Sequence, residues 1–245
     1  MIERLQEPSP RVRAGIAGAL WLIVIVAGGF AVFTRTALIV RDDAALTAAN
    51  MLAFEGRLRL AFVAELIGAA CYLGVTVLLY DLLKPASQIV SLTGAFFGLT
   101  GVAIGAAASL NYLAPVLLLQ GAQPLAAFTT DQLQAEALIF LRLHREGSNA
   151  GIVFFGVQIA TIGYLILRSG LVPRLLGVIL LIGGSVYVAG AFANFLLLPF
   201  RAQLAQFVAL VVLLGEGSLA LWLLTRGVDT QRTKELQTRA LHVGA

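Results

Sequence analysis

Long apolar runs dominate this chain and restrict the folds that it can adopt. Six of them are long enough to cross the hydrocarbon core of a bilayer, which is roughly 30 Å thick and takes about 20 helical residues. They cover approximately residues 14–33, 58–80, 89–119, 149–167, 175–198 and 203–225. The runs are continuous, whereas the strands of a membrane β-barrel alternate apolar and polar residues. We therefore predict an all-α, polytopic membrane protein with six transmembrane helices.

The composition is consistent with a surface that faces lipid. Apolar residues make up 59% of the 245-residue chain and charged residues 12%. A typical soluble domain carries about 25% charged residues. A chain of this length could bury a large soluble core, but it would still need a charged exterior, which this chain lacks.

We expect three regions along the chain. They are a cytoplasmic N-terminal segment (residues 1–13), a single six-helix transmembrane domain (14–228) and a polar C-terminal tail (229–245). The first apolar run is too long for a typical signal-peptide core and has no clear cleavage site, so we interpret it as a retained helix. Cys71 is the single cysteine, which leaves no intrachain disulfide and no cysteine-based metal cluster.

The polar centre of the chain is the stretch from residue 129 to residue 158. Thr129, followed three residues later by Gln132, has the form of a capping box and predicts a helix start. Apolar residues then recur at helical spacing on one face as far as His144. We expect this amphipathic helix to stop at Gly147 and the fourth transmembrane helix to begin near Asn149. A shorter helical run over residues 44–54 is expected to lie along the membrane interface.

The distribution of Lys and Arg predicts the orientation of the chain in the membrane. With the N-terminus in the cytoplasm, ten basic residues fall on the inner side and seven on the outer side. The inner ones are Arg4, Arg11, Arg13, Lys84, Arg168, Arg174, Arg226, Arg232, Lys234 and Arg239; the outer ones are Arg35, Arg41, Arg57, Arg59, Arg142, Arg145 and Arg201. This bias favours both termini in the cytoplasm. Because the basic residues lie at helix ends and in the tails, they indicate no nucleic-acid partner.

Several segments carry a family resemblance. They are residues 42–53, 55–61, 126–128, 131–135, 143–144, 151–156, 163–178, 215–216 and 222–224. In these segments the chain resembles a bacterial family of six-helix integral membrane proteins that is catalogued only as a domain of unknown function. The resemblance implies a multi-pass protein of the bacterial inner membrane. It implies no reaction, substrate or catalytic residue.

Two carboxylates stand inside apolar runs. A charge at the bilayer centre costs on the order of 2.5–3.5 kcal/mol on insertion scales, so Glu65 and Glu216 are expected to face the protein interior or water. Each is a candidate proton, cation or ligand site. The alternative is a structural role, as an interhelical hydrogen bond or an ion pair with Arg57, Arg59 or Arg201.

Three further polar residues complete the candidate ligand- or ion-binding set. His144 continues the apolar face of its helix, and histidine titrates near neutral pH; simple packing with one hydrogen-bond partner is the alternative. Asn111 and Asn194 can hydrogen-bond between helices, as can Gln158. In the predicted orientation, Glu65, Asn111, His144 and Asn194 share the outer half of the bilayer, which suggests a polar pocket open to the outside.

No motif for a known cofactor, metal or nucleophile is present, so we expect no cofactor and no metal site. Glycines 94, 98, 101 and 105 form a small-residue stripe suited to helix packing or to a homo-oligomer contact. Three hypotheses for function stay open. The first is a non-enzymatic protein that binds a small or lipidic ligand. The second is an ion- or proton-coupled transporter or channel, and the third a membrane enzyme acting on lipid or quinone.

Overall fold

The computed structural model describes residues 8–40, 43–120, 127–200, 203, 206–207, 210 and 212–243. These residues form helices and turns, with no strand among them, which confirms the all-α class for this part of the chain. The elements are α1 (Pro10–Leu38), α2 (Ala44–Ala53), α3 (Glu55–Leu83), α4 (Gln88–Leu119), α5 (Thr130–Ser169), α6 (Arg174–Phe195), the π-helix η2 (Val212–Gly217), α8 (Ser218–Thr225) and α9 (Thr230–Val243).

The helix ends follow local chemistry. α1 starts at Pro10 because the Ser9 side chain caps the amide of Val12, and proline suits the first helical position. Asp43 caps α2 in the same way. Thr129 and Gln132 form the predicted capping box at the start of α5. α1 is longer than the predicted 14–33, so Arg35 lies in its last turn and not in a polar loop.

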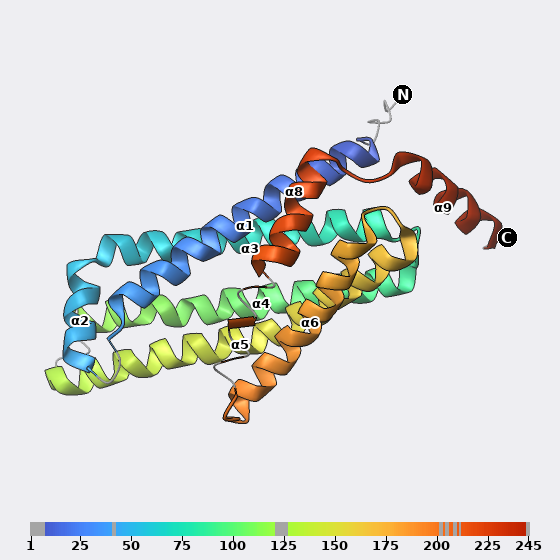
Figure 1. The fold of residues 1–245 in the computed structure, drawn as a ribbon. Coiled ribbons are helices and arrows are strands. Elements are labelled where there is room, and N and C mark those ends of the chain that lie inside the picture. Colours follow the sequence, from blue (N-terminus) through green and yellow to red (C-terminus); the bar gives the residue numbers. More distant parts are fainter. Residues whose placement is uncertain are drawn as a thin grey trace.

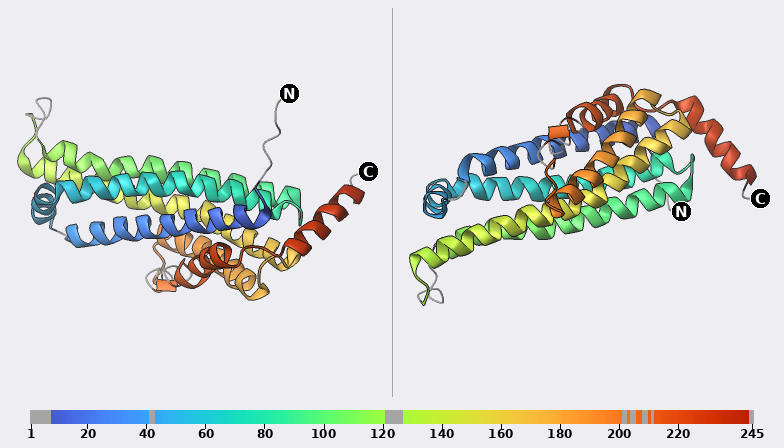
Figure 2. Two further views of the ribbon diagram at one scale, coloured as in Figure 1. Left: turned by 90° about the horizontal axis from the view of Figure 1, so that it is seen from above. Right: turned by 60° about the horizontal axis from the view of Figure 1, so that its bottom comes forward.

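The long helices α1, α3, α4 and α5 run lengthwise and alternate in direction (Figure 1). α3 packs between α1 and α4, and α5 packs between α4 and α6. The short α2 crosses the end of the bundle where α1 stops and α3 begins, as both views of Figure 2 show. α8 packs on α1, and η2 contacts both α6 and α1, so the C-terminal part of the bundle returns to its N-terminal helix.

Glycines allow three of these helix pairs to approach closely. A Cβ atom on Gly163 would lie 2.6 Å from the Gly177 carbonyl oxygen of α6, and one on Gly18 would lie 2.5 Å from the Ala220 carbonyl oxygen of α8. On α4, Gly98 faces the Gln158 side chain of α5. The predicted glycine stripe of α4 therefore serves packing within the chain at Gly98, while Gly105 has open space around it.

The predicted break at Gly147 is wrong. α5 continues as one helix of 40 residues from Thr130 to Ser169, so no separate amphipathic helix precedes a fourth span. Gly147 faces α4, where a Cβ atom would lie 2.7 Å from the Ala108 methyl group. Its missing side chain permits that contact and does not end the helix. Ser148 also stays within the helix, where its hydroxyl donates to the His144 carbonyl at 2.8 Å.

Among the described residues, five helices are long and apolar enough to cross a membrane: α1, α3, α4, α5 and α6. Much of their apolar surface is exposed, as at Val26, Phe96 and Ile182, which is the pattern of a multi-pass membrane protein. The first part of the predicted sixth helix is residues 203–211, and most of these lie outside the described residues. From Val212 onward it is present as η2 and α8.

The buried interior has two apolar clusters. One surrounds Trp21 and Tyr72 near the end where α1 begins, and the other surrounds Met51 and Tyr112 near α2. Each region also contains polar side chains around a carboxylate, Glu216 in the first and Glu65 in the second. These two carboxylate groups are the candidate sites.

Candidate functional site

The first polar group is the Arg35 cluster, which consists of Arg35, Glu65, Ser109, Tyr112 and His144. Arg35 Nη1 donates to Glu65 Oε1 at 2.9 Å and also contacts His144 Nε2. Ser109 Oγ donates to the other carboxylate oxygen, Glu65 Oε2, at 2.6 Å. Helices α1, α3, α4 and α5 thus each bring a polar side chain to one point.

The imidazole of His144 is held on both ring nitrogens. Nδ1 lies 3.0 Å from the Ala108 carbonyl oxygen, which can only accept a hydrogen bond. Nδ1 therefore carries the proton, and Nε2 accepts from the Arg35 guanidinium, which can only donate. The His144 side chain is 3% exposed, whereas those of Arg35 and Glu65 are 22% and 15% exposed. The ion pair is thus the accessible part of the cluster.

Tyr112 closes the cluster from α4, one helical turn after Ser109. Its ring centroid lies 5.3 Å from that of His144 and 5.6 Å from Arg35 Cζ. The Tyr112 hydroxyl is buried, and so is the hydroxyl of Thr34 beside Arg35; neither has a hydrogen-bond partner within the described residues. A buried polar group without a partner costs about 1–3 kcal/mol, so these hydroxyls are unusual.

The second group is the Glu216 cluster, which consists of Glu216, Trp21 and Tyr187. Glu216 Oε2 accepts from Trp21 Nε1 at 3.1 Å, and Oε1 accepts from the Tyr187 hydroxyl. Glu216 is 8% exposed and makes no ion pair within the described part of the chain. It lies in the π-helix η2, a rare geometry that is frequent at functional sites.

The two clusters are separate. Trp21 and Arg35 both lie on α1, 14 residues apart in sequence, which corresponds to about 21 Å along the helix axis. Beside the Glu216 cluster, where the Tyr72 ring packs edge-on against Trp21 with centroids 6.2 Å apart, Tyr72 donates to Gln158 at 2.9 Å, and Gln158 donates to Thr76 at 3.1 Å. All three side chains are buried and satisfied, as expected for hydrogen bonds that join helices.

The five predicted site residues therefore do not share one cavity. Glu65 and His144 come together, while Glu216 lies in the other cluster. Asn194 on α6 donates to Glu146 at 3.3 Å, on another side of α5. Asn111 is half-buried on α4, and the described residues offer its side chain no hydrogen bond.

Sequence reasoning missed the partners of both carboxylates. Glu65 pairs with Arg35, whereas Arg59 pairs with Glu55 at 2.6 Å and Arg57 lies over the Phe33 ring. Arg201 lies outside the described residues. The apolar residues 37–40 that follow Arg35 were the available signal, because they extend the helical run beyond it. The contacts of Trp21 and Tyr187 with Glu216 carry no such local signal.

No group of three or more His, Cys, Asp or Glu side chains that could hold a metal ion occurs in the residues that the structure describes. The Arg35 cluster instead offers hydrogen-bond donors from a guanidinium and a phenol. Such donors suit a ligand that carries acceptor oxygen atoms.

Comparison with protein families finds a match. The family described as "Domain of unknown function (DUF4386)" matches residues 16–227, which is most of the chain. Comparisons with curated proteins and with solved structures give no match. The family match covers most of α1 and every later helix as far as α8, and it confirms the resemblance seen in the sequence. This chain is therefore a member of the DUF4386 family of domains of unknown function.

Proposed function

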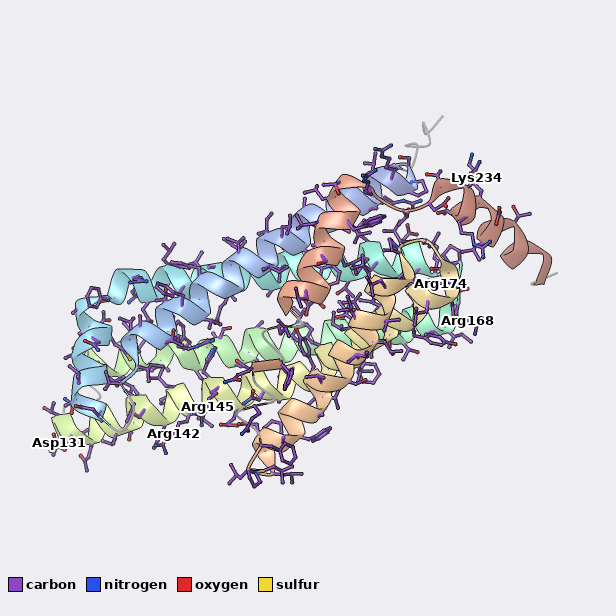
Figure 3. All side chains as sticks on the ribbon, viewed as in Figure 1. Asp131, Arg142, Arg145, Arg168, Arg174 and Lys234 are labelled. Atoms are coloured by element: carbon purple, nitrogen blue, oxygen red, sulfur yellow. The ribbon has the colours of Figure 1, made fainter. Side chains whose placement is uncertain are left out.

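We propose that this protein crosses the bacterial inner membrane six times, with both termini in the cytoplasm. The sixth crossing would include η2 and α8. The start of α1 and helix α9 lie at the same end of the bundle (Figure 1), which supports an even number of crossings. Arg168, Arg174 and Lys234 also lie toward this end (Figure 3), which supports its assignment to the cytoplasm.

We propose that the protein is a non-enzymatic binding protein for a small or lipidic ligand, and that the Arg35 cluster is its site. The observation that carries this proposal is the Tyr112 hydroxyl, which is buried without a partner beside Arg35 and His144. A ligand oxygen that accepts from this hydroxyl would remove the cost of leaving it unpaired.

The chemistry of the cluster narrows the class of ligand. Arg35 and Tyr112 both donate hydrogen bonds, so the ligand should present a carbonyl or carboxylate oxygen. The surroundings are apolar, with Met51, Val116 and Leu141 buried nearby. A lipidic molecule with one oxygen-bearing head group fits this combination.

The test is the thermal unfolding of the purified protein in detergent with three probes: palmitic acid, its methyl ester and hexadecane. We expect the acid or the ester to raise the Tm of the wild type and hexadecane to leave it unchanged. Tyr112→Phe should abolish the increase without lowering the Tm of the ligand-free protein, because it removes a hydroxyl that makes no hydrogen bond.

Glu216→Gln is the matched control in the other cluster and should retain the response. Two outcomes would contradict the proposal. One is that neither oxygen-bearing probe stabilises the wild type. The other is that Tyr112→Phe responds to the probes as strongly as the wild type does.

Proton-coupled transport is a second candidate, and one observation favours it. Glu216 is buried in a π-helix, and the donors that reach its carboxylate, Trp21 and Tyr187, are neutral. Carboxylates inside membrane segments often mark proton relays. Proton uptake by proteoliposomes tests this function, and Glu216→Gln should abolish it. Equal uptake by the variant and the wild type would exclude Glu216 from such a role.

A further inference from the structure

A pocket of about 600 Å³ opens at the end of the bundle opposite to α2. Residues 170–174, in the turn from α5 to α6, form one wall. Residues 226–229, between α8 and α9, form the other wall, and the side chains of Trp222 and Arg232 complete the lining. None of these residues belongs to the Arg35 cluster or the Glu216 cluster.

The two walls are tied to each other. The Asp229 amide donates to the Leu171 carbonyl at 3.1 Å, and Arg232 Nε donates to the Ser169 carbonyl at 3.2 Å. Gly170 and Gly227 adopt positive φ angles of 66° and 71°, which let each helix end in a tight turn. The pocket is therefore a defined element of the fold.

The pocket is basic. Its lining contains Arg174, Arg226 and Arg232 but a single acidic residue, Asp229, which caps α9 by accepting from the Arg232 amide. Arg232 also pairs with Glu235 at 3.0 Å. Arg174 and Arg226 are exposed, and within the described part of the chain neither makes an ion pair. Two guanidinium groups are thus available to an anion.

Exposed apolar surface borders the pocket. Leu175 and Val178 on α6 are 69% and 42% exposed, and Leu224 on α8 is 43% exposed. Trp222 is half-buried in the pocket wall, and tryptophan is enriched where a membrane meets water. A molecule seated here could place an anionic group on the arginines and acyl chains along α6 and α8.

We propose that this pocket binds the phosphate group of an anionic phospholipid, with Arg174 and Arg226 as the contacting residues. Guanidinium groups bind phosphate oxygens in a bidentate manner, and basic pockets on the cytoplasmic side of membrane proteins bind anionic head groups. The site is independent of the ligand proposed for the Arg35 cluster, so either proposal can fail alone.

The experiment measures lipid binding to the full-length protein in detergent by native mass spectrometry. The probes are phosphatidylglycerol, phosphatidylcholine and inorganic phosphate. We expect phosphatidylglycerol to bind more tightly than phosphatidylcholine, and inorganic phosphate not to displace it at equal concentration. In Arg174→Gln/Arg226→Gln, the affinity for phosphatidylglycerol should fall about 30-fold, or roughly 5-fold for each charge removed.

Arg168→Gln is the matched control. It removes a basic residue from the same end of the bundle, but Arg168 lies outside the pocket and contacts Tyr164 instead. It should retain the affinity of the wild type. If Arg168→Gln lost as much affinity for phosphatidylglycerol as the double variant does, the attraction would be a general effect of surface charge, and the proposed site would be wrong. If inorganic phosphate displaced the lipid, the ligand of the pocket would be free phosphate and the proposal of a phospholipid would be overturned. Unchanged affinity in the double variant would exclude the site.

Discussion

Arg35, in the last turn of α1, donates a hydrogen bond of 2.9 Å to Glu65 of α3 and also contacts His144 of α5. One guanidinium therefore joins three of the long helices. The ion pair compensates two charges that would each be costly in an apolar interior. It also fixes the level at which α1, α3 and α5 meet.

Breaking this ion pair should destabilise the fold. Arg35→Gln is expected to lower the free energy of unfolding by about 2–4 kcal/mol, because Glu65 is then left in a largely buried position without its cation. The double variant Arg35→Gln/Glu65→Gln should lose less than the sum of the two single variants. Unfolding in detergent, analysed as a double-mutant cycle, gives the coupling energy.

Arg59 and Glu55 provide the control for that cycle. They form an exposed pair on one turn of α3, and such a pair contributes about 0.3–0.5 kcal/mol. A coupling between Arg35 and Glu65 no larger than this value would contradict a stabilising role for the buried pair.

The close contact between α5 and α6 should not tolerate a methyl group. Gly163→Ala would place a Cβ atom 2.5 Å from the Leu181 amide nitrogen and 2.6 Å from the Gly177 carbonyl, so backbone must move. We expect a loss of about 1–3 kcal/mol, measured as a lower Tm. Gly105→Ala has open space around it and should be neutral or slightly stabilising. Equal Tm values for the two variants would refute this close packing of α5 on α6.

Two Tyr→Phe substitutions separate a bonded hydroxyl from an unbonded one. Tyr187→Phe removes the donor to Glu216 and should cost about 1–3 kcal/mol, since a buried carboxyl oxygen loses its partner. In ligand-free protein, Tyr112→Phe should cost nothing, because the described residues give its hydroxyl no partner. Unfolding in detergent compares them. If Tyr112→Phe were less stable than Tyr187→Phe, neither the hydrogen bond of Tyr187 nor the unpaired hydroxyl of Tyr112 would be supported.

Single cysteines test the proposed orientation. In a Cys71→Ser background, Ala45→Cys and Ala127→Cys lie toward the α2 end, and Gln88→Cys and Thr230→Cys lie toward the other; all four positions are exposed. A membrane-impermeant maleimide should label the first two in spheroplasts and the second two only after lysis. Labelling of both sets from the same side would rule out the six-span arrangement.

Local features of the chain were predictable. The apolar runs located the helices, and the capping box at Thr129 and Gln132 located the start of α5. These signals lie within a few residues of each other, and hydrogen bonds inside one helix do not depend on its neighbours. The role of Gly147 was not predictable, because it depends on a contact that is distant in sequence. Its role is a contact with Ala108, which lies 39 residues earlier, and a local signal cannot distinguish this role from a helix end.

The polar residues were predictable as candidates but not as sites. Glu65 and Glu216 stand out because a carboxylate in an apolar run must find a partner. Which partner it finds depends on how the helices pack: Arg35 is 30 residues from Glu65, and Trp21 is 195 residues from Glu216. Sequence alone thus established a helical membrane protein with a few buried charges. The helix contacts decided that those charges form two separate clusters, because the rotation and depth of each helix depend on close packing at residues such as Gly18, Gly98 and Gly163.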